Sequence, residues 1–69
     1  MVKSVIKVEG MTCDHCKMAV TKAVKGVSGV SSVFVNLDEG LVTVDYEPTI
    51  ANLGSITESI EEAGYDVVS

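Results

Sequence analysis

The order in which the spacing of hydrophobic residues changes along the chain constrains the fold more than any other feature of this sequence. Alternating apolar and polar residues are typical of strands, and apolar residues at i, i+3 or i+4 intervals are typical of helices. The chain passes through these patterns in the order strand, helix, strand, strand, helix, strand. The predicted segments are a strand at residues 2–8, a helix from Asp14 that ends at Gly26, strands at 30–37 and 41–46, a helix that begins between Thr49 and Leu53, and a last strand at 65–68.

Two successive strand–helix–strand units predict a ferredoxin-like fold. The two strands of each unit run parallel and are joined by a right-handed crossover. Asp38-Glu39-Gly40 lies between two alternating runs and predicts a hairpin that joins the two units. We therefore expect an α+β fold of the βαββαβ type, with a four-stranded antiparallel sheet and two helices on one face. A chain of 69 residues has room for one such domain, which we expect to span residues 1–69.

The spacing also predicts which helical residues face the core. One stripe lies on each helix, because residues three or four apart share a face. The predicted stripes are Cys16, Val20, Ala23, Val24 and Val27 on the first helix, and Leu53, Ile56, Ile60 and Ala63 on the second.

The size of the chain and its hydropathy exclude several kinds of protein. A domain of 69 residues buries only about 60% of the surface that its unfolded chain exposes, so we expect a surface site and no deep substrate pocket. The chain has no run of about 18 apolar residues, and residues 1–8 lack the pattern of a signal peptide. We therefore expect a cytoplasmic protein that is not inserted in a membrane.

The charged residues are unevenly distributed. The net charge is −5, which argues against a nucleic-acid partner, because phosphates require a basic face. All five lysines lie in residues 1–34, and residues 35–69 contain acidic residues and no base. Lys17, Lys22 and Lys25 lie off the apolar stripe of the first helix, where they are either solvated or form a face that docks a charged protein.

Cys13 and Cys16 are the residues whose spacing points to chemistry. One precedes the first helix and the other lies in its first turn, so both sulfurs can point to one place. The free N–H groups and partial positive charge of a helix N-terminus favour the thiolate, which is the form that binds metals. Two soft ligands without a second Cys or His pair do not complete a zinc tetrahedron. They suit Cu(I), with Ag(I) as a mimic and Hg(II) as an alternative.

The same Cys-x-x-Cys spacing also occurs in thiol–disulfide oxidoreductases, and this alternative stays open from the residues alone. Against it, the chain is short for a thioredoxin fold and the cysteine loop lacks Trp and Pro.

A resemblance to a known family adds to this interpretation. Gly10-Met11-Thr12-Cys13-x-x-Cys16, after a strand and before a helix, is similar to the heavy-metal-associated domain. The resemblance extends over nearly the whole chain, and it is strongest to bacterial copper chaperones of the CopZ type. Further segments that carry it are Val33-x-Val35-Asn36-Leu37, the strand from Gly40 to Val44, and Glu62-Ala63-Gly64-Tyr65-Asp66-Val67.

The resemblance implies the ferredoxin-like fold, Cys13 and Cys16 as metal ligands, and no catalytic activity. It implies a cytoplasmic copper chaperone that carries one Cu(I) as cargo to the metal-binding domain of a copper-transporting P-type ATPase or to a copper-responsive repressor. A copper-bridged homodimer is a further expectation, because thiolates of two copies can share the metal.

Three residues are candidates for indirect roles at the site. We expect Met11 to be a buried anchor of the loop. We expect His15 to be an exposed polar residue, with tuning of the thiols or metal binding in a dimer as its alternative roles, and Tyr65 to close the core or to shield a sulfur. The alternatives within this interpretation are an N-terminal metal-binding domain of a copper P-type ATPase, a mercury-binding protein and a thiol–disulfide oxidoreductase.

Overall fold

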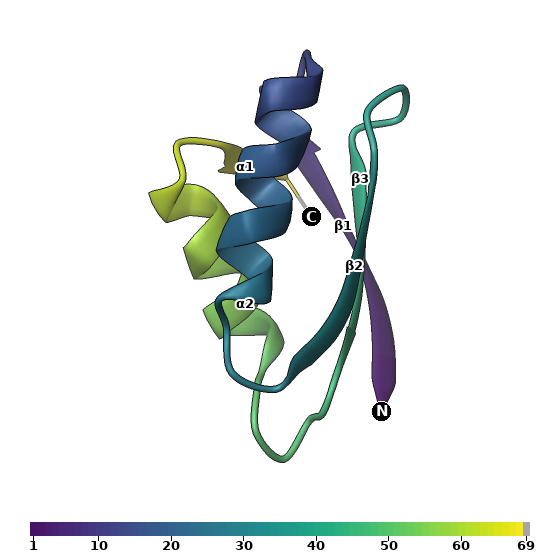
Figure 1. The fold of residues 1–69 in the computed structure, drawn as a ribbon, viewed down its shortest axis with the longest axis vertical. Coiled ribbons are helices and arrows are strands. Elements are labelled where there is room, and N and C mark those ends of the chain that lie inside the picture. Colours follow the sequence, from purple (N-terminus) through teal and green to yellow (C-terminus); the bar gives the residue numbers. More distant parts are fainter. Residues whose placement is uncertain (69) are drawn as a thin grey trace.

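The computed structural model describes residues 1–68 and contains the six predicted elements in the predicted order (Figure 1). The boundaries differ from the sequence prediction by only one or two residues at most ends. The elements are β1 (Val2–Glu9), α1 (Asp14–Lys25), β2 (Val30–Asn36), β3 (Leu41–Tyr46), α2 (Leu53–Glu62) and β4 (Asp66–Val67).

The four strands form one sheet in the order β2-β3-β1-β4, and each neighbouring pair is antiparallel. β2 and β3 form the expected hairpin, in which Gly40 has a positive φ of 67°. The two helices lie side by side on one face of the sheet and run in opposite directions (Figure 1). This arrangement confirms the predicted ferredoxin-like fold.

The core lies between the sheet and the helices. Val20 and Val24 from α1 and Ile56 and Ile60 from α2 are completely buried. They pack against the inward-facing residues of the strands, which include Ile6, Val8, Val35, Val42, Val44 and Tyr46. The helical spacing therefore identified these four helical core positions correctly.

Two positions of the predicted α2 stripe are exposed, so that part of the prediction was wrong. Leu53 is 42% exposed, and Ala63 also lies at the surface. Both lie at the ends of the helix: Leu53 is its first residue and Ala63 is its C-cap. Helical spacing gives the direction of a side chain but not whether another element covers that end of the helix.

The end of β1 is held on both sides, and the cysteine loop leaves from it. On one side, the Val8 amide donates to the Gly40 carbonyl of the hairpin at 2.8 Å. On the other side, β4 pairs with Val8 and Glu9. Tyr65 immediately precedes β4, so the fold brings the C-terminal part of the chain beside this loop.

Within residues 1–68, neither helix has the length and apolar character needed to cross a membrane.

Candidate metal centre

The loop between β1 and α1 is shaped by two residues. Gly10 has a φ of 95°, a backbone conformation that side-chain-bearing residues rarely adopt. Met11 follows it and is only 6% exposed, because its side chain packs into the hydrophobic core. The turn and the buried side chain hold the start of the loop, and the next two residues, Thr12 and Cys13, are exposed.

Cys13 is the N-cap of α1, and Cys16 lies in the first turn of the helix. The carbonyl of Cys13 accepts the first helical hydrogen bond, from the Lys17 amide at 3.1 Å. No side chain caps the helix N-terminus. The first amides of α1 are therefore free to donate to sulfur atoms or to solvent.

The two sulfur atoms lie together at the surface. The distance between Cys13 Sγ and Cys16 Sγ is 3.6 Å, and both residues are free thiols. Cys13 is exposed and Cys16 is half-buried, so an incoming ligand reaches the pair from the Cys13 side. The spacing predicted that both sulfurs point to one place, and the structure brings them together.

The surroundings of Cys16 favour its thiolate. Its pKa is lowered from the ordinary value of 9.0 to about 6, chiefly by a side-chain hydrogen bond from Tyr65. The backbone of Thr12 and the side chain of Cys13 lower the pKa of Cys16 further. At neutral pH Cys16 is therefore mostly ionised. The pKa of Tyr65 is raised in turn, because its hydroxyl donates to the sulfur.

Tyr65 reaches the cysteines across the loop. A Cβ atom at Gly10 would lie 3.5 Å from Cδ1 of Tyr65, so the ring packs directly on the glycine backbone. Gly64, with a φ of 100°, turns the chain from α2 toward β4 just before this tyrosine. Tyr65 therefore both packs on the core and contacts a sulfur, although the sequence presented these as alternatives.

His15 is the remaining candidate for an indirect role. His15 is exposed, and residues 1–68 contain no group of three or more His, Cys, Asp or Glu side chains arranged to hold a metal ion. Sequence reasoning did not identify the backbone of Thr12 as a contributor, because a backbone donor leaves no signal in residue type.

The geometry fits a small carrier of soft metals, and comparison with known proteins agrees with it. Residues 5–66 match the heavy-metal-associated domain family. The chain belongs to this family. A heavy-metal-associated domain binds metal and performs no reaction, so the chain is not an enzyme.

Related heavy-metal-associated proteins are similar over nearly their whole length. The chain is 49% identical over 67 residues to the copper chaperone CopZ of Staphylococcus epidermidis, covering 97% of this chain and 98% of the relative. Its fold matches that of a solved CopZ metallochaperone with a TM-score of 0.96 at 42% identity, covering 97% and 100% of the two chains. It also matches a copper binding domain from HMA7, a P-type ATPase, with a TM-score of 0.93 at 32% identity, covering 100% and 96%.

Proposed function

We propose that this chain is a cytoplasmic copper chaperone that binds one Cu(I) through the thiolates of Cys13 and Cys16. The observation that carries the proposal is the pair of free sulfurs 3.6 Å apart at the exposed N-terminus of α1. The chemistry supports Cu(I) because two thiolates form a soft, low-coordinate site. The names of the relatives support copper as the metal.

The separation of the sulfurs supports release as well as binding. With a metal–sulfur bond of about 2.3 Å, two sulfurs 3.6 Å apart would subtend roughly 100° at the metal. With the sulfurs at this separation, the S–Cu–S angle would be bent and the solvent side of the ion would be open to a third sulfur. A partner thiolate can form a bond to Cu(I) before either cysteine of this chain lets go, and the copper remains Cu(I) throughout.

The recipient that fits is a metal-binding domain of a copper-transporting P-type ATPase with an acidic surface. Lys17, Lys22 and Lys25 are exposed on α1, directly after the cysteine loop. The similarity of the fold to a P-type ATPase copper domain supports a recipient of the same size and shape. A copper-responsive repressor is a second recipient, and a copper-bridged homodimer uses the same exposed Cys13.

A second candidate function is that of a metal-binding domain within a copper P-type ATPase, which the HMA7 similarity favours. The site chemistry would be unchanged, but the domain would receive copper instead of delivering it. Downstream membrane-spanning segments in the same reading frame would decide for this candidate.

An anaerobic Cu(I) titration against a chromophoric chelator tests the site. The unaltered protein should bind one Cu(I) tightly, and Cys13→Ser and Cys16→Ser should each lose at least about a hundredfold in affinity, because one thiolate cannot hold the ion alone. Met18→Leu is a matched control, since Met18 is another exposed sulfur-bearing residue on α1. Unchanged affinity in either serine variant would remove the proposed site.

Three further measurements separate the alternatives. X-ray absorption of the loaded protein should show short copper–sulfur distances, and a shell of nitrogen or oxygen would exclude the thiolate site. Competition between Hg(II) and Cu(I) under a buffering chelator tests mercury handling, and an insulin-reduction assay tests oxidoreductase activity.

A further inference from the structure

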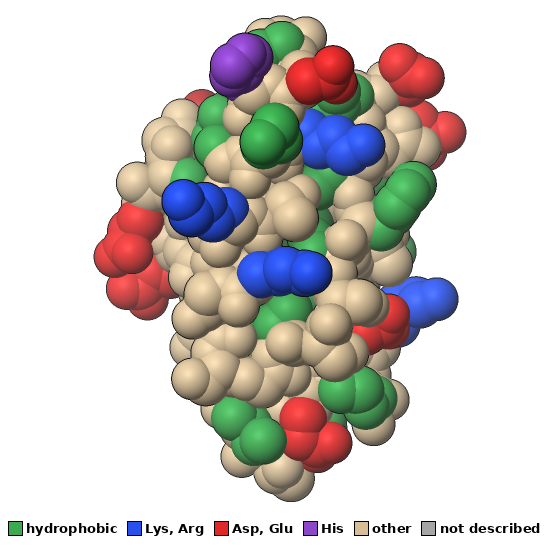
Figure 2. All heavy atoms as spheres, viewed as in Figure 1, with side chains coloured by type: hydrophobic (Ala, Val, Ile, Leu, Met, Phe, Trp, Pro, Cys, Tyr) green, Lys and Arg blue, Asp and Glu red, His purple; other side chains and the backbone are tan. Residues whose placement is uncertain are grey.

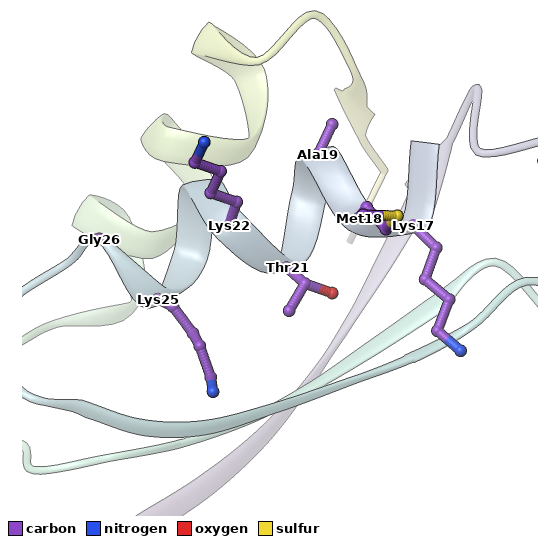
Figure 3. Close-up of a pocket in the computed structure, with 7 residues that line it drawn as sticks. All are labelled: Lys17, Met18, Ala19, Thr21, Lys22, Lys25 and Gly26. Carbon is purple, nitrogen blue, oxygen red and sulfur yellow. The ribbon is translucent and has the colours of Figure 1, made fainter. Parts of the chain in front are cut away.

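The outer side of α1 carries a basic stripe that points away from the core. Met18, Lys22 and Lys25 are spaced i, i+4 and i+7, so they share a face opposite the buried Val20 and Val24. All three are exposed, and Met18 is 68% exposed. A surface hollow of about 730 Å³ runs along this side of the helix, with lysines extending on both sides of it (Figure 3). We call Met18, Lys22 and Lys25 the α1 stripe.

The outer side of α2 carries an acidic stripe of the same length. Ser55, Glu58 and Glu62 are spaced i, i+3 and i+7 and are exposed, opposite the buried Ile56 and Ile60. Residues 53–62 contain no basic residue. Figure 2 shows lysine side chains gathered over α1 and acidic side chains at the edge where α2 lies. We call Ser55, Glu58 and Glu62 the α2 stripe.

The two stripes lie at the same level along the molecule. A hollow of about 290 Å³ between the helices is bordered by Gly26 at the end of α1 and by Ser55, Glu58 and Glu62 of α2. Gly26 also borders the hollow along α1. The C-terminal half of α1, with Lys22 and Lys25, is therefore beside the acidic stripe.

The stripes are side by side and do not neutralise each other. Within residues 1–68, an ion pair links the N-terminal amine to Glu47 at 3.9 Å, and it involves neither stripe. The lysines of α1 have no carboxylate within ion-pair distance in this part of the chain, since both stripes point outward. Each stripe therefore remains available to a surface of opposite charge.

We propose that these helices form an interface between two copies of this chain, in which the α1 stripe of each copy contacts the α2 stripe of the other. The helices run in opposite directions on one face of the sheet (Figure 1). Two copies can face each other with their helix layers, related by a two-fold axis that is parallel to the helices and lies between the copies. In this arrangement α1 of each copy lies opposite α2 of the other. This contact is isologous and closed, so it forms a dimer and not a chain of molecules.

This dimer differs from a copper-bridged one because it needs no sulfur. Because the axis is parallel to the helices, both cysteine loops lie at the same end of the dimer. The interface covers Lys22 and Lys25. Self-association therefore competes with any partner that docks on these lysines. The dimer is weak, since exposed ion pairs contribute little individually and each copy carries a net charge of −5.

Reciprocal charge reversal tests the pairing. All proteins carry Cys13→Ser and Cys16→Ser, which exclude metal bridges and disulfides. One variant adds Lys22→Glu and Lys25→Glu, and the other adds Glu58→Lys and Glu62→Lys. Each charge reversal changes the net charge by two, so the variants carry about −9 and −1, and an equal mixture has the same total charge as two unaltered copies.

Sedimentation equilibrium at fixed ionic strength measures the association, and circular dichroism checks that each variant is folded. The parent should dimerise, each variant alone should associate at least about tenfold more weakly, and their mixture should recover the parent's dissociation constant to within about threefold. A parent that stays monomeric overturns the proposal. A mixture that does not associate also overturns it, as does stronger self-association of the −1 variant, which would mean that net charge alone controls association. None of these outcomes depends on metal binding, so they leave the proposed function to its own test.

Discussion

The contact between Tyr65 and Cys16 gives the most direct test of how this site is tuned. Tyr65→Phe removes one hydroxyl and keeps the ring that packs on Gly10. Four hydrogen bonds together lower the pKa of Cys16 from 9.0 to about 6, and the bond from Tyr65 is the largest. Removing it should raise the pKa of Cys16 by about one pH unit or more.

The effect is measurable at mildly acidic pH. At pH 6 about half of Cys16 is ionised in the unaltered protein, because its pKa is about 6. A rise of about one unit leaves roughly one-tenth ionised, so alkylation of Cys16 by iodoacetamide should slow about fivefold. An anaerobic titration of protein with ¹³C-labelled cysteine, followed by NMR, resolves Cys16 from Cys13 and gives the midpoint directly.

Tyr46→Phe is the matched control. The Tyr46 hydroxyl lies 3.4 Å from Ser4 Oγ in the sheet and contacts neither cysteine, so its loss should leave the midpoint of Cys16 unchanged. The same midpoint in Tyr65→Phe and in the unaltered protein would refute the reasoning. An equal shift in both variants would mean that the change is not transmitted through the Tyr65 hydroxyl.

Three further predictions concern stability. The pKa of Cys16 is lower in the folded state, so the unfolded chain binds more protons between about pH 6 and 9. The unfolding free energy of the metal-free protein should therefore rise with pH in this window. Denaturant titrations at several pH values should show this rise, and the Cys16→Ser variant should lack it. Gly10→Ala should destabilise by about 1–2 kcal/mol because of its φ of 95°, whereas Gly26→Ala, at a φ of −72°, should stay within about 0.5 kcal/mol in urea unfolding. Equal effects of the two glycine substitutions would contradict the backbone argument. Ile56→Ala should cost about 2–5 kcal/mol because the side chain is completely buried, and Leu53→Ala, at a residue 42% exposed, should cost less than about 1 kcal/mol by thermal unfolding; the reverse order would show that burial in the structure does not govern stability here.

The fold was largely predictable from the sequence because each element has a clear hydrophobic period. Ile56 and Ile60 were placed in the core by spacing alone, and both are fully buried. Leu53 and Ala63 belong to the same stripe but are exposed. Burial at a helix end depends on what covers that end, and this information lies in other elements, not in the periodicity of the helix.

The candidate site was predictable only in part. The spacing of Cys13 and Cys16 and their position at a helix start identified the pair. The approach of Tyr65 could not be derived from spacing, because it depends on the pairing of β4 with β1 and on the bare backbone of Gly10. The backbone of Thr12 contributes to Cys16 without any signature in its side chain.

The absence of a side-chain cap on α1 has a consequence for the empty and loaded forms. A Ser or Asp side chain at the position of Cys13 would cap the helix and stabilise its first turn by about 0.5–2 kcal/mol. Helix α1 lacks this stabilisation. The empty helix therefore frays most easily at the turn that contains Cys16. An ion bound by both sulfurs would link Cys13 to Cys16 and hold that turn in its helical conformation. The first turn would therefore be stiffer in the loaded protein than in the empty one, and an approaching partner would meet a different surface in the two forms.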